Sequence, residues 1–543
     1  MSVNSGSNPR VETATPHSIE RRGSSSSTQR SRLFIVAIGL TLFLLVLLRT
    51  AWVCDDAYIT FRTVDNFVHG YGLTWNVSER VQSYTNPLWM MVFTAIYAVT
   101  HEAYFTSIAL SIVISLLAVF VVASTFAETR GASVVVFAAL LSSKAFVDFS
   151  TSGLENALMH LLIVTLLWVY WRGSTGPRRL FQLTLIASLC LLNRLDLIFL
   201  LAPLLLVESA RVGIRAGWTA VLAGAAPLIA WEIFATIYYG FPLPNTAYAK
   251  LLGADVSHVA LFRRGMFYAF ATGLFDPATI AIIVAAPLTI IGARRWRDWP
   301  LVVGLIVHGL YVTSVGGDFM YGRFFTPLVV WSVALFARAE WLSSTRIATA
   351  VASAVLVLGV LAADEPALFS GNHAWTPFPR YQWFAGEAID ERKQFFATTG
   401  MFNQTRGEIA PHHEWALQGV GMHGRHGVIV LGAIGFAGYF AGPTMHIIDE
   451  YGLADPLLAR LPPYGTDRIG HFIRTVPKGY EQTIATGVNH IDDPALAKYY
   501  DRLHEVVSGP VWRRERLLTV TAMLLGRYDA SRDSYVRRYR RTK

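Results

Sequence analysis

A succession of long apolar segments is the feature that most constrains how this chain can fold. A bilayer core about 30 Å thick is crossed by a helix of roughly 20 consecutive apolar residues. Only 15% of the 543 residues are charged and 53% are hydrophobic, whereas soluble domains carry roughly 25% charged residues. The sequence therefore predicts a polytopic α-helical membrane protein. Its candidate spans are 33–53, 87–104, 106–127, 131–149, 153–171, 180–207, 218–239, 274–292, 300–315, 325–338 and 346–363.

Two of these segments are irregular. The stretch 180–207 is interrupted by Asn-Arg-Leu-Asp at 193–196, whose charges would cost about 3 kcal/mol each in lipid. We therefore expect two short helices that meet at this turn. Four apolar segments lie between residues 87 and 171, whereas an extracytoplasmic start and a cytoplasmic end require an odd number of crossings. We expect 87–104 to be the irregular segment, either re-entrant or partly interfacial. Roughly eleven transmembrane helices result.

The distribution of charge predicts the orientation. Short basic loops such as 171–179 and 293–299 should be cytoplasmic, because Lys and Arg are retained on that side. Alternation from these loops places 193–196, 240–250 and 316–325 on the opposite side, together with the residues that follow the first span. The unusual polar motifs thus converge on one extracytoplasmic face.

The two ends of the chain differ from the apolar region 33–363. Residues 1–32 are rich in Ser and Arg and are predicted to form a disordered cytoplasmic tail. Residues 364–543 lack continuous apolar runs, which predicts a C-terminal soluble α/β domain on the periplasmic side. The one apolar stretch there, 426–442, is Gly-rich and too short to cross a bilayer, so a buried strand and turn is expected.

Charge and cysteine content exclude other classes. The net charge of +9 comes from short basic clusters between apolar segments and near the C-terminus. That pattern is typical of the positive-inside rule and of lipid headgroup contacts, and not of nucleic-acid binding. Cys54 and Cys190 form no disulfide framework and lack metal-ligand spacing.

The first extracytoplasmic loop, 55–86, opens with an acidic pair. Asp55 and Asp56 directly follow the first span, and Arg62 lies one to two turns later. Loops of this length in a compact bundle are uncommon unless functional. Paired carboxylates can act as a general base, bind a metal, or accept hydrogen bonds from sugar hydroxyls. Two interfacial carboxylates that cap a helix explain the pair equally well.

Further polar side chains are expected on the same face. The planar guanidinium of Arg194 suits a phosphate, with Asp196 fixing its direction, although a mutually paired turn is an equal alternative. The others are Glu155, Asn245, Tyr248, Lys250, Asp318, Tyr321 and Arg323. Acids and aromatic rings suit a sugar and cations suit a phosphate, so a lipid-linked sugar phosphate fits the whole set.

Several stretches are similar to one family. They are "DDAYITFRTVDNFVHGYGLTWNVSERVQSYTNPLW", "GLENAL", "NRLD", "PLPNTAYAK", "GGDFMYGRFF" and "IGFAGYFAGPTMHIIDEYGLADP". An apolar helix that runs into an acidic pair, and a long first loop, resemble the GT-C polyprenyl-phosphate-sugar glycosyltransferases. The longer first-loop pattern is similar to the terminal β-(1→2) arabinofuranosyltransferases of mycobacterial and corynebacterial cell-wall arabinan. The resemblance runs over about residues 33–470.

The resemblance implies a reaction and its residues. It implies transfer of arabinofuranose from decaprenyl-phosphate-arabinose to arabinan of arabinogalactan or lipoarabinomannan, on the periplasmic side of the bacterial inner membrane. Asp55 would lead the chemistry as nucleophile or by orienting an acceptor hydroxyl, with Asp56 beside it. Arg62, Arg194, Lys250 and Arg323 would bind the donor phosphate. Glu155, Asn245, Tyr248, Asp318 and Tyr321 would contact sugar or acceptor. A single-phosphate donor requires no cofactor and leaves room for a divalent cation.

Other functions remain open on the sequence. A related transferase could use another polyprenyl-phosphate sugar, or a protein, pilin or lipid-glycan acceptor. A transporter of lipid-linked saccharides would place polar residues deep in its spans and carry internal repeats, whereas the polar motifs here lie at span boundaries. A non-catalytic glycan-binding scaffold leaves the convergence of acids and cations unexplained. The sequence does not indicate an oligomeric state.

Overall fold

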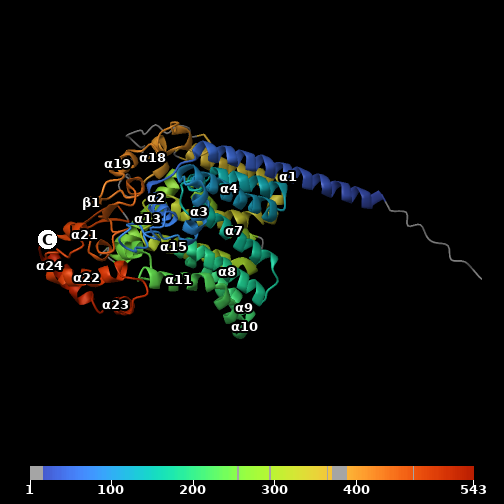
Figure 1. Ribbon diagram of the computed structural model, residues 1–543. Helices are drawn as coiled ribbons and strands as arrows, with labels where there is room; N and C mark the ends of the chain where they lie inside the picture. Colours follow the sequence, from blue (N-terminus) through green and yellow to red (C-terminus); the bar gives the residue numbers. More distant parts are fainter. Residues whose placement is uncertain are drawn as a thin grey trace, which may run out of the picture.

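The computed structural model describes residues 16–252, 256–292, 295–363, 365–369, 388–468 and 470–542. Within them the apolar region forms a bundle of helices, and the carboxy-terminal segment 388–542 lies at one end of it (Figure 1). Helix α1 (Pro16–Thr50) extends out of the bundle at the other end. It begins inside the stretch 1–32 that the sequence predicts to be disordered, because an established apolar helix is extended at little cost per residue.

Among the residues that the structure describes, three helical stretches are long and apolar enough to cross a membrane: Gln29–Thr50, Tyr104–Phe126 and Thr345–Ala362. They comprise the end of α1, α4 (Tyr104–Val121) with its π-helical turn, and α17 (Thr345–Val357) with another. Two bent pairs raise the number to five if each pair is one span. These are α10 (Ile214–Gly224) with α11 (Ala226–Tyr238), bent by 52°, and α13 (His258–Phe275) with α14 (Pro277–Gly292), bent by 110°. The predicted count of eleven crossings stays a prediction.

Shorter apolar helices fill the bundle. They are α3 (Pro87–Thr100), α5 (Arg130–Ser142), α7 (Asn156–Arg172), α15 (Trp299–Ser314) and α16 (Thr326–Ala337). Every residue of α16 is buried, and this helix packs against α5, α7 and α14. A helix that is apolar on all sides belongs to the core of a large protein or of a membrane bundle.

The predicted break near residue 193 is confirmed. Helix α8 (Pro177–Asn193) ends where Arg194 adopts an extended backbone, a short 3-10 turn follows, and α9 (Ile198–Val212) begins. A second break was not expected: Ser143 divides the predicted span 131–149 into α5 and α6 (Lys144–Asp148). The Ser143 hydroxyl accepts a hydrogen bond of 3.2 Å from the Phe146 N–H and so caps α6.

The first loop is packed into the interior of the protein. Its helix α2 (Asp55–Val68) is mostly buried between α3 and α20 (Phe436–Ala441). Ile59 and Trp75 share a buried apolar cluster with Ile434 and Ile447 of the carboxy-terminal segment. The two parts therefore share a core, and a separate soluble domain at 364–543 stays a prediction.

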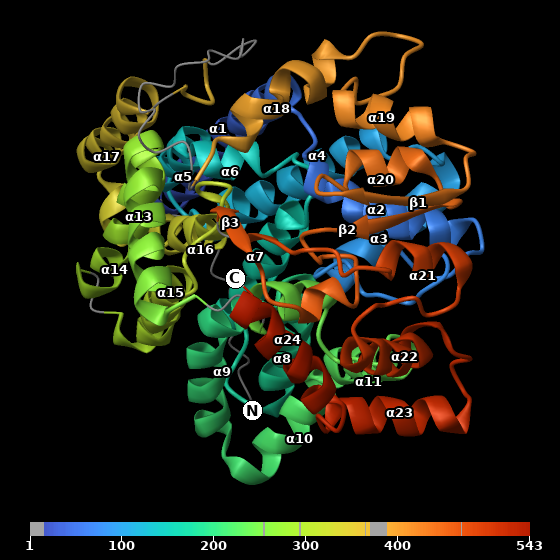
Figure 2. The same cartoon turned by 90° about the vertical axis from the view of Figure 1, so that its left-hand side faces the viewer.

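The carboxy-terminal segment is mainly helical and lies in front in Figure 2. Strand β1 (Gly427–Leu431) pairs in parallel with β2 (Met445–Asp449), and α20 lies between them in sequence. The strand expected within 426–442 is present as β1, but none of its residues is buried, and the helix α20 follows it where a turn was expected. A second sheet pairs β3 (Gly465–Arg468) with β4 (His471–Ile473). The other helices are α18 (Glu391–Thr399), α19 (Glu414–Met422), α21 (Tyr480–Thr486), α22 (Pro494–Ser508), α23 (Arg514–Leu524) and α24 (Asp529–Thr542).

Candidate functional site

A buried ion network lies where α7, the α8–α9 break and the first loop meet. Arg194 binds both oxygens of Asp196 at 3.0 Å and donates at 3.1 Å to Oε1 of Glu155. The two carboxylates hold the Arg194 guanidinium from both sides and so fix its direction. The paired turn that the sequence left as an alternative is present.

Two asparagines complete the support of Glu155, and sequence reasoning missed both. Asn86 donates to Oε2 of Glu155 at 3.0 Å, and Asn193 donates to its backbone carbonyl at 3.0 Å. Asn86 stands just before Pro87 at the start of α3, and Asn193 ends α8. The only signal in the sequence is that polar residues follow or precede apolar helices at these two positions.

The backbone around residue 153 brings Glu155 close to α2. Gly153 has a φ of +80°, and a side chain there would lie 2.8 Å from Val53 and 2.9 Å from Ala57. The backbone N–H of Cys54 donates to the carbonyl of Ser152 at 3.0 Å. Only glycine combines this backbone conformation with such close approach, so the start of α7 is fixed against the acidic pair.

Asp318, Arg323 and Lys250 extend the network. The Arg323 guanidinium lies 3.5 Å from Asp318 and 3.6 Å from Glu155, and its Nε atom has no hydrogen-bond partner in the part of the chain that the structure describes. Burial raises the pKa of Asp318, against the lowering effect of Arg323, Lys250 and Arg194. Three predicted phosphate-binding cations therefore act on one carboxylate.

Asp56 faces this network. It is half-buried, and its charge raises the pKa of Asp318 alongside burial. Among the described residues no hydrogen bond or ion pair holds its carboxylate. Its charge also acts on the Arg323 guanidinium, so an acid without a partner lies next to a cation and is available to a ligand.

Asp55 points elsewhere. Its carboxylate accepts hydrogen bonds from the backbone N–H groups of Gly435 (3.2 Å) and Phe436 (2.7 Å), at the start of α20. Burial raises its pKa to about 7, although these two N–H groups act to lower it. Successive residues of a helix project about 100° apart, which is why neighbouring aspartates serve two different surroundings. Asp55 thus joins the first loop to the carboxy-terminal segment.

Arg62 also lies in that junction and away from the ion network. Its guanidinium donates to the backbone carbonyls of Trp75 (2.8 Å), Gly438 (2.5 Å) and Met445 (2.9 Å), and it stacks on Trp75 at 4.2 Å. Burial lowers its pKa to about 9. Its donors are occupied by protein carbonyls, which accounts for its position without a phosphate.

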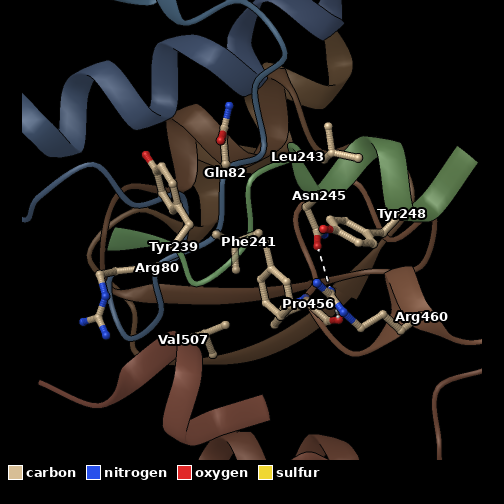
Figure 3. Close-up of a pocket in the computed structure, with 11 residues that line it drawn as sticks. Arg80, Gln82, Tyr239, Phe241, Leu243, Asn245, Tyr248, Pro456, Arg460 and Val507 are labelled. Atoms are coloured by element: carbon tan, nitrogen blue, oxygen red, sulfur yellow. Dashed lines mark hydrogen bonds between the residues drawn. The ribbon is translucent and has the colours of Figure 1, made fainter. Parts of the chain in front are cut away.

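Asn245 and Tyr248 line a small cavity between the first loop, the 240–250 loop and the carboxy-terminal segment (Figure 3). The Asn245 amide donates to the carbonyls of Gly452 and Asp455, and its oxygen accepts from Arg460 at 3.1 Å. The Arg460 guanidinium lies 4.5 Å from the Tyr248 ring. Asn245 is therefore a structural link.

Tyr321 belongs to a second buried cluster. Its hydroxyl donates to Asp390 at 2.9 Å, and Lys144 forms ion pairs with Asp390 (3.1 Å) and Asp148. The cluster ties α6 to the residue that caps α18. The described ranges contain no group of three or more His, Cys, Asp or Glu side chains arranged to hold a metal ion.

Comparisons with known proteins support the resemblance. The chain is 29% identical over 318 residues to a Corynebacterium glutamicum protein named terminal β-(1→2)-arabinofuranosyltransferase. The aligned region covers 50% of this chain and 46% of that protein. It is 25% identical over 514 residues to the Mycobacterium tuberculosis protein of the same name, over 77% of this chain and 80% of that protein. The first match thus spans less than half the length of the relative. No protein-family model and no solved structure matches the chain. The chain is therefore a relative of the terminal β-(1→2)-arabinofuranosyltransferases, as its motifs predict.

Proposed function

We propose that the chain is a membrane glycosyltransferase that moves arabinofuranose from a decaprenyl-phosphate donor to arabinan of the cell envelope. The names of the relatives support sugar transfer, and the apolar helices support a donor with a lipid tail. The observation that carries the proposal is Asp56, a half-buried carboxylate without a partner among the described residues, whose charge acts on both Asp318 and Arg323. The reaction is proposed for the extracytoplasmic face.

Arg323 and Lys250 are proposed to bind the donor phosphate. Arg323 is held only at 3.5 to 3.6 Å by its acids, and Lys250 has no ion pair among the described residues. Guanidinium and ammonium groups near lipid are weakly screened and favour an anionic oxygen. Arg194 is already bound by Glu155 and Asp196. Its proposed role is therefore to position the Glu155 carboxylate next to Arg323.

Asp56 and Asp318 are proposed to act on the sugar that is transferred. In the transfer, the bond between the anomeric carbon and the phosphate oxygen breaks, and the electron pair leaves with the polyprenyl phosphate. With inversion the acceptor oxygen attacks the anomeric carbon directly, and Asp56 is the general base that takes its proton. With retention Asp56 is the nucleophile: it bonds to the anomeric carbon as the phosphate leaves, and it is released when the acceptor oxygen attacks that carbon, the hydroxyl proton passing to the departed phosphate. Asp318 is placed to accept hydrogen bonds from sugar hydroxyls.

Residues whose polar groups already bind other parts of the protein are not assigned to the donor or acceptor site. Asp55, Arg62, Asn245 and Tyr321 each use their polar groups on the protein itself. Tyr248 is stacked near Arg460 in the cavity of Figure 3. Their predicted roles in catalysis and binding are therefore replaced by structural ones in this proposal.

The direct test is an assay with purified protein in detergent. Decaprenyl-phosphate-arabinose and an arabinan oligosaccharide should give a product with one added arabinofuranose, and linkage analysis reports the anomeric outcome. Glucose- and mannose-carrying polyprenyl phosphates are the controls for donor identity. Addition of EDTA to the same assay measures any dependence on a divalent cation. Transfer from a control donor alone would refute the arabinosyl assignment.

A further inference from the structure

The 316–325 loop, which carries two residues of the proposed donor site, pairs with an extended stretch of the carboxy-terminal segment. The backbone N–H of Ile389 donates to the carbonyl of Phe319 at 2.7 Å, and the N–H of Tyr321 donates to the carbonyl of Ile389 at 3.2 Å. Met320 and Ile389 thus form a parallel bridge between segments that are far apart in sequence. The backbone of the loop is therefore held by the carboxy-terminal segment.

These backbone contacts reach the side chains of the donor site. The N–H of Phe319, whose carbonyl accepts from Ile389, donates at 2.9 Å to Oδ1 of Asp318. The sulfur of Met320 accepts a hydrogen bond of 3.3 Å from the Arg323 guanidinium. A shift of the loop backbone at this bridge would therefore move the acid and the cation together.

Tyr321 gives the loop a second attachment, through its side chain. Its hydroxyl donates to Asp390 at 2.9 Å, and its ring stacks on Phe275 with 5.2 Å between the centroids. Lys144 forms an ion pair of 3.1 Å with Asp390. Burial acts to raise the pKa of Asp390, but Lys144 and Arg392 hold it below the usual range. The tyrosine thus donates to an ionised carboxylate, which is a stronger contact than one between neutral groups.

The loop has little regular structure of its own. Helix α15 ends at Ser314 and a 3-10 turn begins at Arg323. Residues 315–322, which the structure describes in full, form no helix and no strand apart from the bridge at Met320. A segment without regular structure has few internal hydrogen bonds to stiffen it. Its geometry therefore depends on the contacts with residues 389 and 390.

We propose that Asp390 is a positioning residue for the donor site. Through the Tyr321 hydroxyl, and with the backbone of Ile389 beside it, Asp390 holds the 316–325 loop so that Asp318 and Arg323 meet the sugar and the phosphate of the donor. It acts through the loop and not on the substrate. Donor binding thus depends on the carboxy-terminal segment. This inference rests on the proposed function, which assigns the donor phosphate to Arg323.

Two substitutions in the full-length protein in detergent test this role. Tyr321→Phe removes the hydroxyl and keeps the ring. We expect the KM for decaprenyl-phosphate-arabinose and the Kd for decaprenyl phosphate to rise roughly tenfold, as for one lost hydrogen bond to a charged group. The KM for the acceptor should not change. Asp390→Ala should raise both donor constants at least as much. The double variant should be no worse than Asp390→Ala, because both changes remove the same contact.

Hydrogen exchange of the loop amides gives a readout that does not need activity. Amides of the 316–325 loop should exchange faster in Tyr321→Phe than in the wild type. Should Asp390→Ala not fold, Tyr321→Phe decides the matter alone. If the wild type binds decaprenyl phosphate but transfers no arabinose, the proposed reaction fails, and the Kd and exchange data still test the role of Asp390.

Asp493→Ala is the matched control. Asp493 accepts hydrogen bonds from backbone N–H groups at the start of α22, as Asp390 does from Lys393 at the start of α18. Both alanine variants therefore lose a helix cap. The control should unfold at a lower temperature and keep the wild-type donor KM. Wild-type donor KM and Kd in Tyr321→Phe and in Asp390→Ala, with only a lower unfolding midpoint, would overturn the proposal.

Discussion

Asp55 accepts a hydrogen bond of 2.7 Å from the backbone N–H of Phe436, which lies 381 residues further along the chain. This contact and the one to Gly435 join the start of α2 to the start of α20. A side chain at residue 435 would lie 1.9 Å from the Asp55 carbonyl oxygen. The first member of the acidic pair therefore anchors the carboxy-terminal segment, and the second faces the ion network.

The substitution Asp55→Asn tests the anchor. It turns an amide NH₂ toward one of two backbone N–H donors, and an unsatisfied buried donor costs about 1–3 kcal/mol. We expect a lower midpoint of thermal unfolding and faster hydrogen exchange in α20, with activity reduced in proportion to the folded fraction. Gly435→Ala should give the same pattern. Unchanged unfolding together with complete loss of transfer would instead assign Asp55 to the chemistry.

Arg62→Ala should lower the stability, whereas Arg323→Ala should raise the KM for the donor. Arg62→Ala removes the donors for three buried carbonyls, so stability should fall by about 3 kcal/mol or more while the KM for the donor in the remaining folded protein is unchanged. Arg323→Ala should raise the KM for the donor by at least tenfold, because one charge-assisted contact is worth about 1.5–3 kcal/mol. A raised donor KM in the Arg62 variant would restore that residue to the phosphate site.

Arg194→Ala should be the most damaging change in the network. It leaves Glu155 and Asp196 without their buried cation, and such loss costs about 3–5 kcal/mol. Arg194→Lys keeps the charge and cannot reproduce the two-point contact with Asp196, so it should fold and retain reduced activity. Thermal unfolding and the KM values for donor and acceptor check both variants. Wild-type stability of Arg194→Ala would contradict the structural part assigned to this side chain.

The contact between the first loop and the carboxy-terminal segment should become less stable as the pH rises. Burial, and then proximity to Asp455, raises the pKa of Glu79 from 4.5 to about 8, and burial raises that of Asp455 from 3.8 to about 6. His446, 3.8 Å from Glu79, stays neutral because burial lowers its pKa to about 3. A pKa raised on folding gives stability that is full below the ordinary pKa and is lost as the pH passes the folded value.

Hydrogen exchange of β2 amides measures this dependence. Protection should fall steadily from about pH 4 to about pH 8. Glu79→Gln removes the proton that titrates last and keeps the shape of the side chain, so it should flatten the upper part of the profile. A wild-type profile that is flat over this range, or that rises with pH, would contradict the raised pKa values.

Much of the site could be predicted from the positions of the motifs. The break at 193–196 was readable because two charges interrupt an apolar run, and burial of Arg194 with Asp196 and Glu155 follows from their high cost when unpaired in lipid. Loops at the ends of apolar helices bring Asp318 and Arg323 to the same end of the bundle. Local composition suffices for such features.

Contacts between distant segments could not be predicted. Nothing near Arg62 shows that its partners are carbonyls of residues 438 and 445, and nothing near Asp55 shows that α20 begins against it. Helix α13 was overlooked because Arg263 and Arg264 interrupt its apolar pattern. The bend of 110° after it places two helices where one span at 274–292 was expected.

The transfer activity of Asp56→Asn tests the central claim most directly. The purified variant is given decaprenyl-phosphate-arabinose and an arabinan oligosaccharide, and its unfolding midpoint is measured alongside. We expect the wild-type midpoint, because no partner of this carboxylate is lost among the described residues, and a loss of transfer of at least about 100-fold, typical of a missing general base. Transfer at the wild-type rate by Asp56→Asn would contradict the account.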